Sequence, residues 1–131
     1  MSKVMVFGTF DILHPGHLYF LTQAKKSGSF LTVLIARDQT VLEVKGKLPQ
    51  HDEATRFKNI SDLKIADRVV LGNLDDKYQI IKDEKPDIIA LGYDQRAFTD
   101  KLADILDKKV KIIKIKPFKE DIYKSSKLRN K

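Results

Sequence analysis

The sequence of 131 residues contains no cysteine, which excludes disulfide bonds and every metal or redox site built on a thiolate. No apolar stretch approaches the about 18 residues that a membrane span requires. The first residues lack the long apolar segment and the cleavage site of a secretory signal. Zinc-finger spacings and the aromatic motifs of RNA-recognition domains are also missing. From these absences we expect a soluble, cytoplasmic protein that has no membrane contact.

What the sequence has in excess is positive charge. It contains 25 lysines and arginines against 18 aspartates and glutamates, which gives a net charge of +7. Such an excess favours polyanionic partners, either nucleoside triphosphates or nucleic acid, and it is also compatible with an ordinary solvated surface. The lysines cluster only at Lys108–Lys119 and Lys124–Lys131. Because a nucleic-acid role would rest on charge alone, we expect small-molecule ligands.

Hydrophobic patterning predicts a single domain, residues 1–131, in which strands and helices alternate. The expected strands are Val4–Phe7, Phe30–Ala36, Arg68–Leu71, Asp87–Leu91 and a half-exposed edge strand, Val110–Ile115. Helical periodicity occurs at Gly16–Lys26, Asp52–Leu63, Lys77–Asp83 and Thr99–Asp107. Nearly continuous apolar strands are typical of a parallel sheet covered on both faces. We therefore predict an α/β fold, a Rossmann-like, doubly wound, parallel five-stranded sheet with helices on both faces.

The segment 37–51 shows no clear periodicity and is predicted to be a long loop. Loops of this length in compact domains are often functional, and the alternative is a mobile surface excursion. In doubly wound folds, ligands bind beyond the carboxyl ends of the strands. Those ends include Gly8–Asp11, Ala36–Asp38 and Gly92–Gln95, of which the first and last are rich in glycine and polar groups. We expect them to form one site.

The stretch GTFDILHPGH, residues 8–17, connects the first expected strand to the first expected helix. Gly8 permits a tight turn and close approach of a ligand, and Thr9 and Phe10 follow it. Pro15 suits the first turn of a helix, where its missing N–H costs nothing. The stretch therefore predicts a strand, a turn at the expected site, and a helix that begins near Pro15.

His14 and His17 are expected to lie on one face of this first helical turn. A helix N-terminus attracts anions, and two imidazole donors beside it suit the charge that develops on a phosphoryl group during transfer. Gly16 between them would leave room for a ligand close to the backbone. The alternative is a pair of capping or core histidines. A zinc pair is disfavoured because no third ligand accompanies the histidines in a recognisable pattern.

The stretch GTFDILHPGH resembles the His-x-Gly-His signature of the cytidylyltransferase-like nucleotidyltransferases, and the resemblance covers essentially the whole chain. Within that group the segments IARDQTV, KGKLP and KPDIIALGYDQ resemble archaeal-type FAD synthases in the same order. The first motif and the basic loop are also similar to glycerol-3-phosphate cytidylyltransferases. The tail IYKSSKLRNK resembles the last motif of the family, a cluster of Ser and Thr that opens a helix.

The resemblance implies roles for individual residues. His14 and His17 would stabilise the transition state, and Lys45 would neutralise the triphosphate. Nucleotide contacts are implied for Gly8, Thr9, Phe10, His14, Pro15, Gly16, His17, Arg56, Gly92, Asp94, Tyr123, Ser125 and Ser126. Acceptor contacts are implied for Asp11, Asp38 and Lys47. The alternatives are a solvated Lys45, an Asp94 that caps a helix, and an Arg56 that pairs with Asp52 or Glu53 on its own helix.

The reaction that the resemblance implies is adenylyl transfer from ATP to FMN, which gives FAD and pyrophosphate. A divalent metal, Mg²⁺, would be held mainly by phosphate oxygens, without dedicated protein ligands. One alternative is CTP-dependent transfer to glycerol 3-phosphate or to another sugar or polyol phosphate. Another is a nucleotide-binding module without catalysis. By family analogy, we also expect a homodimer.

Overall fold

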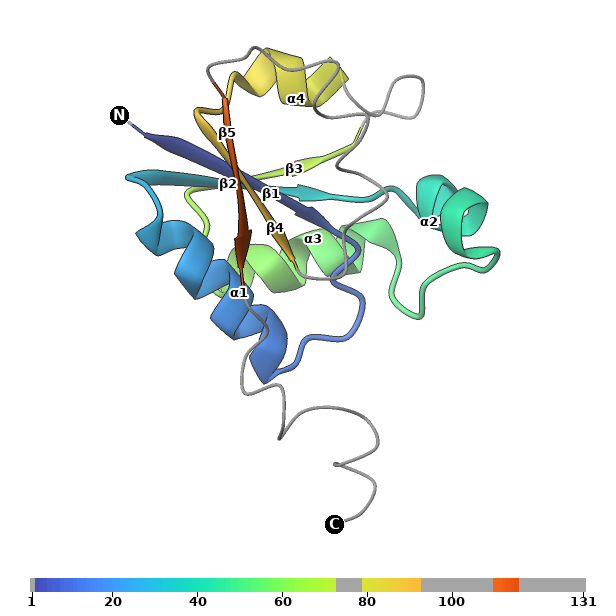
Figure 1. Cartoon of the computed structure of the whole chain (residues 1–131). Helices are drawn as coiled ribbons and strands as arrows, with labels where there is room; N and C mark the ends of the chain where they lie inside the picture. Colours follow the sequence, from blue (N-terminus) through green and yellow to red (C-terminus); the bar gives the residue numbers. More distant parts are fainter. Residues whose placement is uncertain (1, 73–78, 93–109, 116–131) are drawn as a thin grey trace.

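The computed structural model describes residues 2–72, 79–92 and 110–115. Within these ranges the strands are β1 (Lys3–Gly8), β2 (Phe30–Ile35), β3 (Arg68–Leu71), β4 (Ile88–Gly92) and β5 (Lys111–Ile115). The helices are α1 (Pro15–Lys26), α2 (Asp38–Lys45), α3 (Glu53–Asp62) and α4 (Gln79–Glu84). The five strands form one sheet in the order β3-β2-β1-β4-β5, and every neighbouring pair is parallel (Figure 1).

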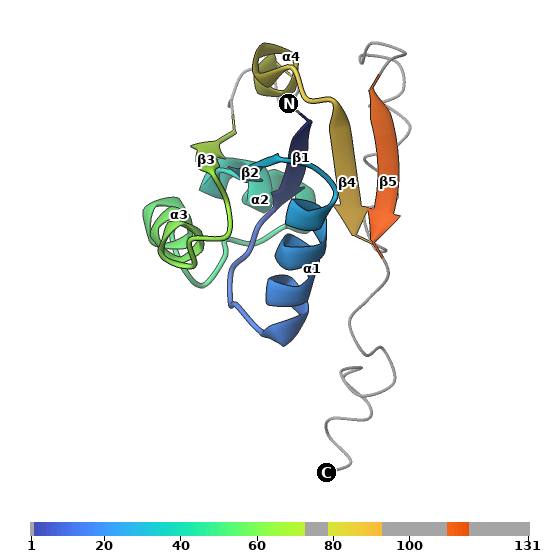
Figure 2. The same ribbon diagram turned by 90° about the vertical axis from the view of Figure 1, so that its left-hand side faces the viewer.

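Successive residues of β1 pack on opposite faces of the sheet, as the pleat requires. Val4 and Val6 belong to a buried cluster that contains Leu21 and Ala24 of α1 and Ile60 of α3. Met5 and Phe7 belong to a second cluster, which contains Ile81 of α4. Helices α1 and α3 therefore cover one face and α4 covers the other (Figure 2). This arrangement confirms the predicted doubly wound fold.

Two aspartates fasten the strands at the amino end of the sheet. Asp67 precedes β3, and its carboxylate accepts the Leu31 N–H at 2.8 Å while its own N–H donates to the Leu31 carbonyl at 2.9 Å. Asp87 precedes β4 and makes the same pair of bonds with Lys3, both at 2.9 Å. The Lys25 ammonium adds an ion pair to Asp67. Each aspartate thus extends the pairing of two parallel strands by one side chain.

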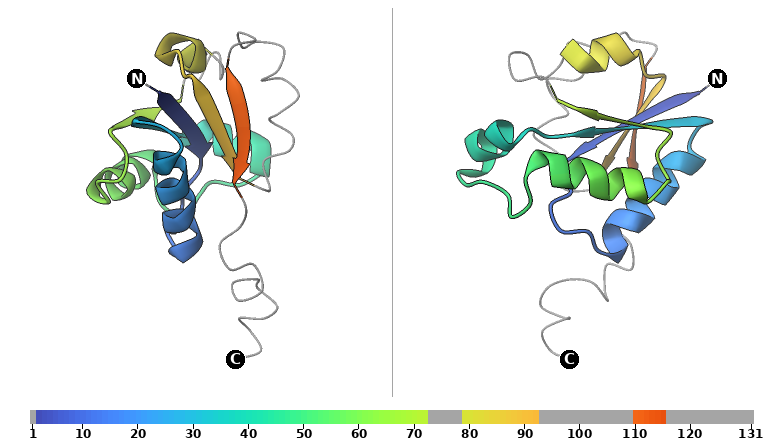
Figure 3. Two further views of the ribbon diagram at one scale, coloured as in Figure 1. Left: turned by 60° about the vertical axis from the view of Figure 1, so that its left-hand side comes forward. Right: turned by 180° about the vertical axis from the view of Figure 1, so that it is seen from behind.

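The segment 37–51, predicted as a loop, contains the helix α2, so this prediction was wrong. Only Val41 of α2 is buried, and residues 42–48 are all exposed. The helix extends beyond the end of β2 and does not cover a face of the sheet (Figure 3). With eight residues and one buried side chain, α2 is too short to show the repeated apolar stripe of a helix that packs on a core.

The other predicted elements agree with the structure within one or two residues. β5 is an edge strand in which Lys111 and Lys114 are exposed, as the alternating pattern predicted. The predicted helix Thr99–Asp107 lies outside the described residues. None of the helices in the described ranges has both the length and the apolar character that a membrane span requires.

Candidate active site

The carboxyl ends of β1 and β2 adjoin, because Gly8 and Ile35 are partners in the register of the two strands. The chain leaves β1 at Gly8, turns through residues 9–14, and enters α1 at Pro15. It leaves β2 at Ile35 and enters α2 at Asp38. The N-termini of α1 and α2 therefore both follow strand ends at the same edge of the sheet, the edge at which ligands bind in doubly wound folds.

His14 is the N-cap residue of α1, and its Nδ1 accepts a hydrogen bond from the Gly16 N–H at 3.0 Å. Its extended backbone (φ −144°, ψ 172°) lets Pro15 begin the helix at N1. In a neutral imidazole that accepts at Nδ1, the proton resides on Nε2. His14 therefore caps the helix with one nitrogen and can offer its other nitrogen, on an exposed ring, as a donor to a ligand.

His17 stacks on His14, with 3.9 Å between ring centroids and 29° between ring planes. The Phe10 ring meets His17 edge-on, with the centroids 5.6 Å apart. Phe10 is 5% exposed, and its backbone has a φ of +51°, a conformation that non-glycine residues rarely adopt. The three rings therefore form one packed series between the end of β1 and the first turn of α1.

The two glycines of the motif make room for these rings. A Cβ added to Gly8 would lie 2.6 Å from the Phe10 ring, and one added to Gly16 would lie 2.7 Å from Cε1 of His14. Both distances are shorter than real Cβ contacts allow. The sequence interpretation gave Gly16 the role of leaving room for a ligand, whereas the atoms that fill this space in the structure belong to His14. The two glycines thus leave the space that the Phe10 and His14 rings occupy.

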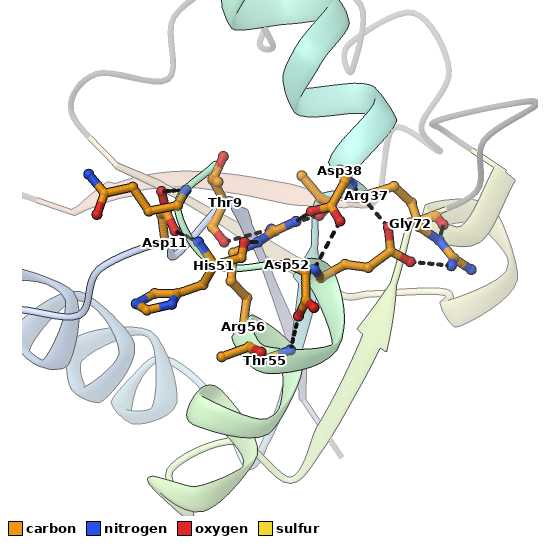
Figure 4. A network of polar contacts seen from close by, with 12 residues as sticks. Thr9, Asp11, Arg37, Asp38, His51, Asp52, Thr55, Arg56 and Gly72 are labelled. Atoms are coloured by element: carbon orange, nitrogen blue, oxygen red, sulfur yellow. Dashed lines mark hydrogen bonds and ion pairs between the residues drawn. The ribbon is translucent and has the colours of Figure 1, made fainter. Parts of the chain in front are cut away.

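Arg56 of α3 is fully buried and joins four segments of the carboxyl edge (Figure 4). Its guanidinium donates to the carbonyls of Thr9 at 2.9 Å, Ala36 at 2.7 Å and His51 at 3.0 Å. Its remaining bond is an ion pair of 2.6 Å with Asp38. The sequence interpretation left Arg56 open between a phosphate contact and a pair with Asp52 or Glu53. In the structure the Arg56 guanidinium instead forms its ion pair with Asp38, the first residue of α2.

Asp38 and Glu53 cap each other's helices. The Asp38 N–H donates to Glu53 Oε1 at 3.0 Å, and the Glu53 N–H donates to Asp38 Oδ2 at 3.2 Å. Arg37 completes the network, because it donates to Glu53 Oε2 at 2.7 Å and to the Gly72 carbonyl at 2.7 Å. Asp38 was predicted to bind the acceptor, whereas both of its carboxylate oxygens accept hydrogen bonds from protein groups. The network anchors the N-terminus of α2 to α3 and to the end of β3.

The carboxylate of Asp11, also predicted to bind the acceptor, accepts two backbone N–H groups. Gln50 donates to Oδ2 at 2.7 Å and His51 donates to Oδ1 at 2.8 Å. Partial burial raises the pKa of Asp11, but these two bonds and the nearby charges of His51 and Arg56 outweigh it and hold the pKa below its ordinary value of 3.8. Asp11 is therefore an ionised group that ties the motif loop to the loop before α3.

Lys45 and Lys47 lie on either side of Gly46, which ends α2 in the left-handed conformation (φ +79°). Both lysines belong to the exposed stretch 42–48, so their ammonium groups can reach a ligand from solvent. Gly92 is the last residue of β4 and is half-buried. Asp94, Tyr123, Ser125 and Ser126 lie outside the described residues.

Sequence reasoning missed three residues of this network: Arg37, Glu53 and His51. Glu53 could have been suspected as an acidic residue in the first turn of a helix, but its partners are 15 or 16 residues away in the chain. His51 takes part through its backbone N–H and C=O, which no side-chain pattern reveals. In the described part of the chain, no group of three or more His, Asp or Glu side chains could hold a metal ion.

Comparison with known proteins places this chain in a family. The model of the cytidylyltransferase-like family matches residues 5–131. A protein named FAD synthase from Aciduliprofundum boonei is 44% identical over 90% of this chain and 80% of its own length. Another FAD synthase, from Thermoplasma volcanium, is 42% identical over 100% of this chain and 94% of its own length.

Solved structures share the fold of this chain. One described as a lipopolysaccharide core biosynthesis protein from Thermoplasma volcanium has a TM-score of 0.81 and 43% identity, over 90% of this chain and 98% of that one. A pantoate-beta-alanine ligase from Francisella tularensis, at 15% identity over 98% of this chain and 67% of that one, shares the fold with a TM-score of 0.65. The family model matches almost all of the sequence, and the relatives exceed 40% identity. The chain therefore belongs to the cytidylyltransferase-like family of nucleotidyltransferases.

Proposed function

We propose that this protein is an FAD synthase, which transfers the adenylyl group of ATP to FMN and releases pyrophosphate. The observation that carries the proposal is the stacked pair His14 and His17 at the positive end of α1, beside the carboxyl end of β1. Identity of more than 40% to proteins named FAD synthase supports the choice of ATP and FMN. The alternative is CTP-dependent transfer to glycerol 3-phosphate or to another polyol phosphate.

In the proposed reaction an oxygen of the FMN phosphate attacks the α-phosphorus of ATP in line. A new P–O bond forms, the bond from the α-phosphorus to the bridging oxygen breaks, and pyrophosphate leaves with that electron pair. The attacking phosphate is already ionised at neutral pH, so no general base is required. Catalysis then consists of positioning and charge neutralisation.

The residues at the site suit this division of work. The imidazoles of His14 and His17 would donate hydrogen bonds to the α-phosphate as its charge redistributes. Lys45 would act on the outer phosphates as a point charge from the exposed end of α2. The resemblance implied an acceptor contact for Lys47, but Lys47 lies on the same exposed stretch as Lys45, and we assign it to the same phosphates. Mg²⁺ would neutralise the same phosphates, and the triphosphate would hold it, because the carboxylates of Asp11 and Asp38 already accept N–H groups of the protein.

Exposed apolar side chains near the site favour FMN over a polyol phosphate as acceptor. Among the described residues, the large hydrophobic side chains that are exposed are Ile12, Leu18, Leu42, Val44 and Leu48. All five belong to the two segments that follow β1 and β2 at the carboxyl edge. An isoalloxazine ring can bury such side chains, whereas glycerol phosphate offers mainly hydroxyl groups. We expect I12S/L18S to raise KM for FMN several-fold while KM for ATP stays within about twofold.

Pyrophosphate release decides between the candidates. The purified protein is incubated with ATP or CTP, each combined with FMN or glycerol 3-phosphate, and pyrophosphate is measured together with the quenching of flavin fluorescence. We expect turnover only with ATP and FMN. Turnover with CTP and glycerol 3-phosphate would favour the alternative. Nucleotide binding without pyrophosphate release under any condition would identify a binding module.

We also propose a cellular location and an oligomeric state for this protein. A cytoplasmic location fits small phosphorylated substrates, and family analogy suggests a homodimer of one-domain subunits. Light scattering on the purified chain measures the oligomeric state directly. A mass near 15.0 kDa would contradict the homodimer, and a mass near twice that value would support it.

A further inference from the structure

The two lysines proposed to contact the phosphates lie on a segment that projects from the sheet. Its N-terminal attachment is the network around Asp38 and Glu53. Beyond Val41 the residues up to Leu48 are exposed, so packing contributes little to holding the segment in place. An exposed stretch of this kind samples many conformations unless other bonds fix it.

Asp11 supplies bonds at the other end of this segment. Its carboxylate accepts the N–H groups of Gln50 and His51, which lie 39 and 40 residues away in the sequence. The Arg56 guanidinium holds the His51 carbonyl from the opposite side. Figure 4 shows both interactions at the point where the segment returns to α3. Asp11 therefore closes the stretch that contains Lys45 and Lys47 into a loop fixed at both ends.

This arrangement differs from direct binding of substrate by Asp11. Each of its two oxygens already accepts a short hydrogen bond from the backbone, and hydrogen bonds to a charged group are stronger than those between neutral groups. A carboxylate beside the phosphates of ATP and FMN would also repel them. The bonds instead place Asp11 between the motif loop, which carries His14, and the lysine-bearing segment.

We propose that Asp11 is a positioning residue, which fixes the lysine segment, residues 45–50, so that Lys45 and Lys47 meet the nucleotide phosphates in a defined place. The proposal rests on the proposed function in taking a nucleoside triphosphate as the ligand. In this proposal Asp11 affects the binding of ATP by fixing the position of the two lysines, and it does not contact the acceptor.

The test compares D11N in the normal background and in a K45A/K47A background. Asn retains the size of Asp, but its amide nitrogen meets one of the two N–H donors. In the normal background we expect kcat/KM for ATP to fall about 10- to 100-fold through a higher KM, with KM for FMN nearly unchanged. In the K45A/K47A background we expect D11N to lower kcat/KM for ATP less than about threefold, because the two lysines that Asp11 positions are absent.

A second measurement reads the position of the segment without turnover. Hydrogen exchange of a peptide that covers residues 46–51 is expected to accelerate in D11N. The matched control is D52N, because Asp52 is an aspartate of the same loop whose carboxylate accepts a backbone N–H, that of Thr55 at 2.8 Å. We expect D52N to weaken the start of α3 and to leave KM for ATP and the exchange of 46–51 unchanged.

The outcomes separate the possibilities. A higher KM for FMN with normal KM for ATP would show that Asp11 contacts the acceptor and would overturn the proposal. So would an equal loss in both backgrounds, or unchanged exchange in residues 46–51. If the wild-type protein shows no turnover with ATP and FMN, the proposed function fails. Dissociation constants for ATP in the same four proteins would then still decide the role of Asp11.

Discussion

The two ends of the parallel sheet use the same chemical group for different purposes. At the amino end, the carboxylates of Asp67 and Asp87 accept N–H groups from the start of a neighbouring strand. At the carboxyl end, those of Asp11 and Asp38 accept N–H groups from a loop and from the first turn of a helix. The amino end therefore reinforces strand pairing, whereas the carboxyl end fixes segments that the sheet itself does not hold.

The ends also differ in how deeply their cations are buried. Lys25, which pairs with Asp67, is about one-third exposed (36%), whereas Arg56, which pairs with Asp38, is fully buried. A buried guanidinium requires hydrogen-bond acceptors, and Arg56 donates four hydrogen bonds, to three carbonyls and a carboxylate. We therefore expect substitution of a buried residue at the carboxyl end to lower stability, and substitution of a more exposed one there to impair catalysis. Substitutions at the amino end should affect stability alone.

The largest effect is expected for R56A. Removal of the guanidinium leaves the carbonyls of Thr9, Ala36 and His51 without their donor and Asp38 without its partner, so we expect a loss of about 3 kcal/mol or more in unfolding free energy. Urea denaturation measures this loss. R56K, which retains the charge but not the fork of donors, should recover only part of it. A normal unfolding midpoint with a raised KM for ATP would instead identify a direct phosphate contact.

The next effect is chiefly catalytic. We expect H17A to lower kcat by about 10²- to 10³-fold, the range for loss of one preorganised donor. The urea midpoint should fall modestly, because His14 and Phe10 lose the ring that packs between them. H51A is the control, because His51 enters the network through its backbone N–H and C=O, which alanine retains. We expect its kcat to stay within about threefold of wild type. Near-normal turnover of a folded H17A would contradict the proposed role of the histidine pair.

A smaller effect is expected for G16A, which moves His14 without removing it. The added methyl would lie 2.7 Å from Cε1 of His14, so the ring must rotate and give up its bond to the Gly16 N–H. Loss of this cap costs about 1 kcal/mol, and the higher helix propensity of alanine offsets up to about 1 kcal/mol. We therefore expect stability close to wild type and kcat about tenfold lower.

The control for G16A is G72A, at the end of β3. A Cβ at Gly72 would be 3.5 Å from Leu34, an ordinary contact, and the carbonyl that accepts from Arg37 remains. We expect wild-type kcat and stability for this variant. Equal kcat for G16A and wild type would show that the placement of the His14 ring does not limit the rate.

The sequence predicted the parts of this molecule that depend on local pattern. Strands β1, β2 and β4 were found because each buries a nearly continuous apolar run, and β5 because lysine and isoleucine alternate along it. Helix α1 was found because Pro15 and the two histidines mark its start. The histidine pair was found for the same reason, since three residues of spacing place both rings on one turn. Gly8 and Gly16 were predicted to leave room for a ligand, whereas the structure shows the rings of Phe10 and His14 in the space beside them.

What the sequence could not predict depends on partners far apart in the chain. Helix α2 buries only Val41, so its N-terminus is defined by a carboxylate 15 residues away and not by its own pattern. Charged carboxylates that follow a strand, such as those of Asp11 and Asp38, favour the prediction of a ligand contact. The protein groups that donate hydrogen bonds to them are seen only in the structure. Arginine is usually a surface residue, and the complete burial of Arg56 is explained only by the three carbonyls that accept its hydrogen bonds.

An effect on stability alone is expected at the amino end, for D67A, and it depends on pH with a definite sign. The Lys25 ammonium and the Leu31 N–H lower the pKa of Asp67 below its ordinary value of 3.8, against the opposing effect of partial burial. A carboxyl whose pKa is lower in the folded state stabilises the fold above the unfolded value and loses that contribution as the pH falls through the folded value. At neutral pH we expect D67A to lose about 1–2 kcal/mol with kcat unchanged. Urea denaturation at decreasing pH should show this deficit shrinking below about pH 4, because the wild-type carboxylate is then protonated as well. A drop in kcat without a drop in stability would show that the two ends of the sheet are not separate in function.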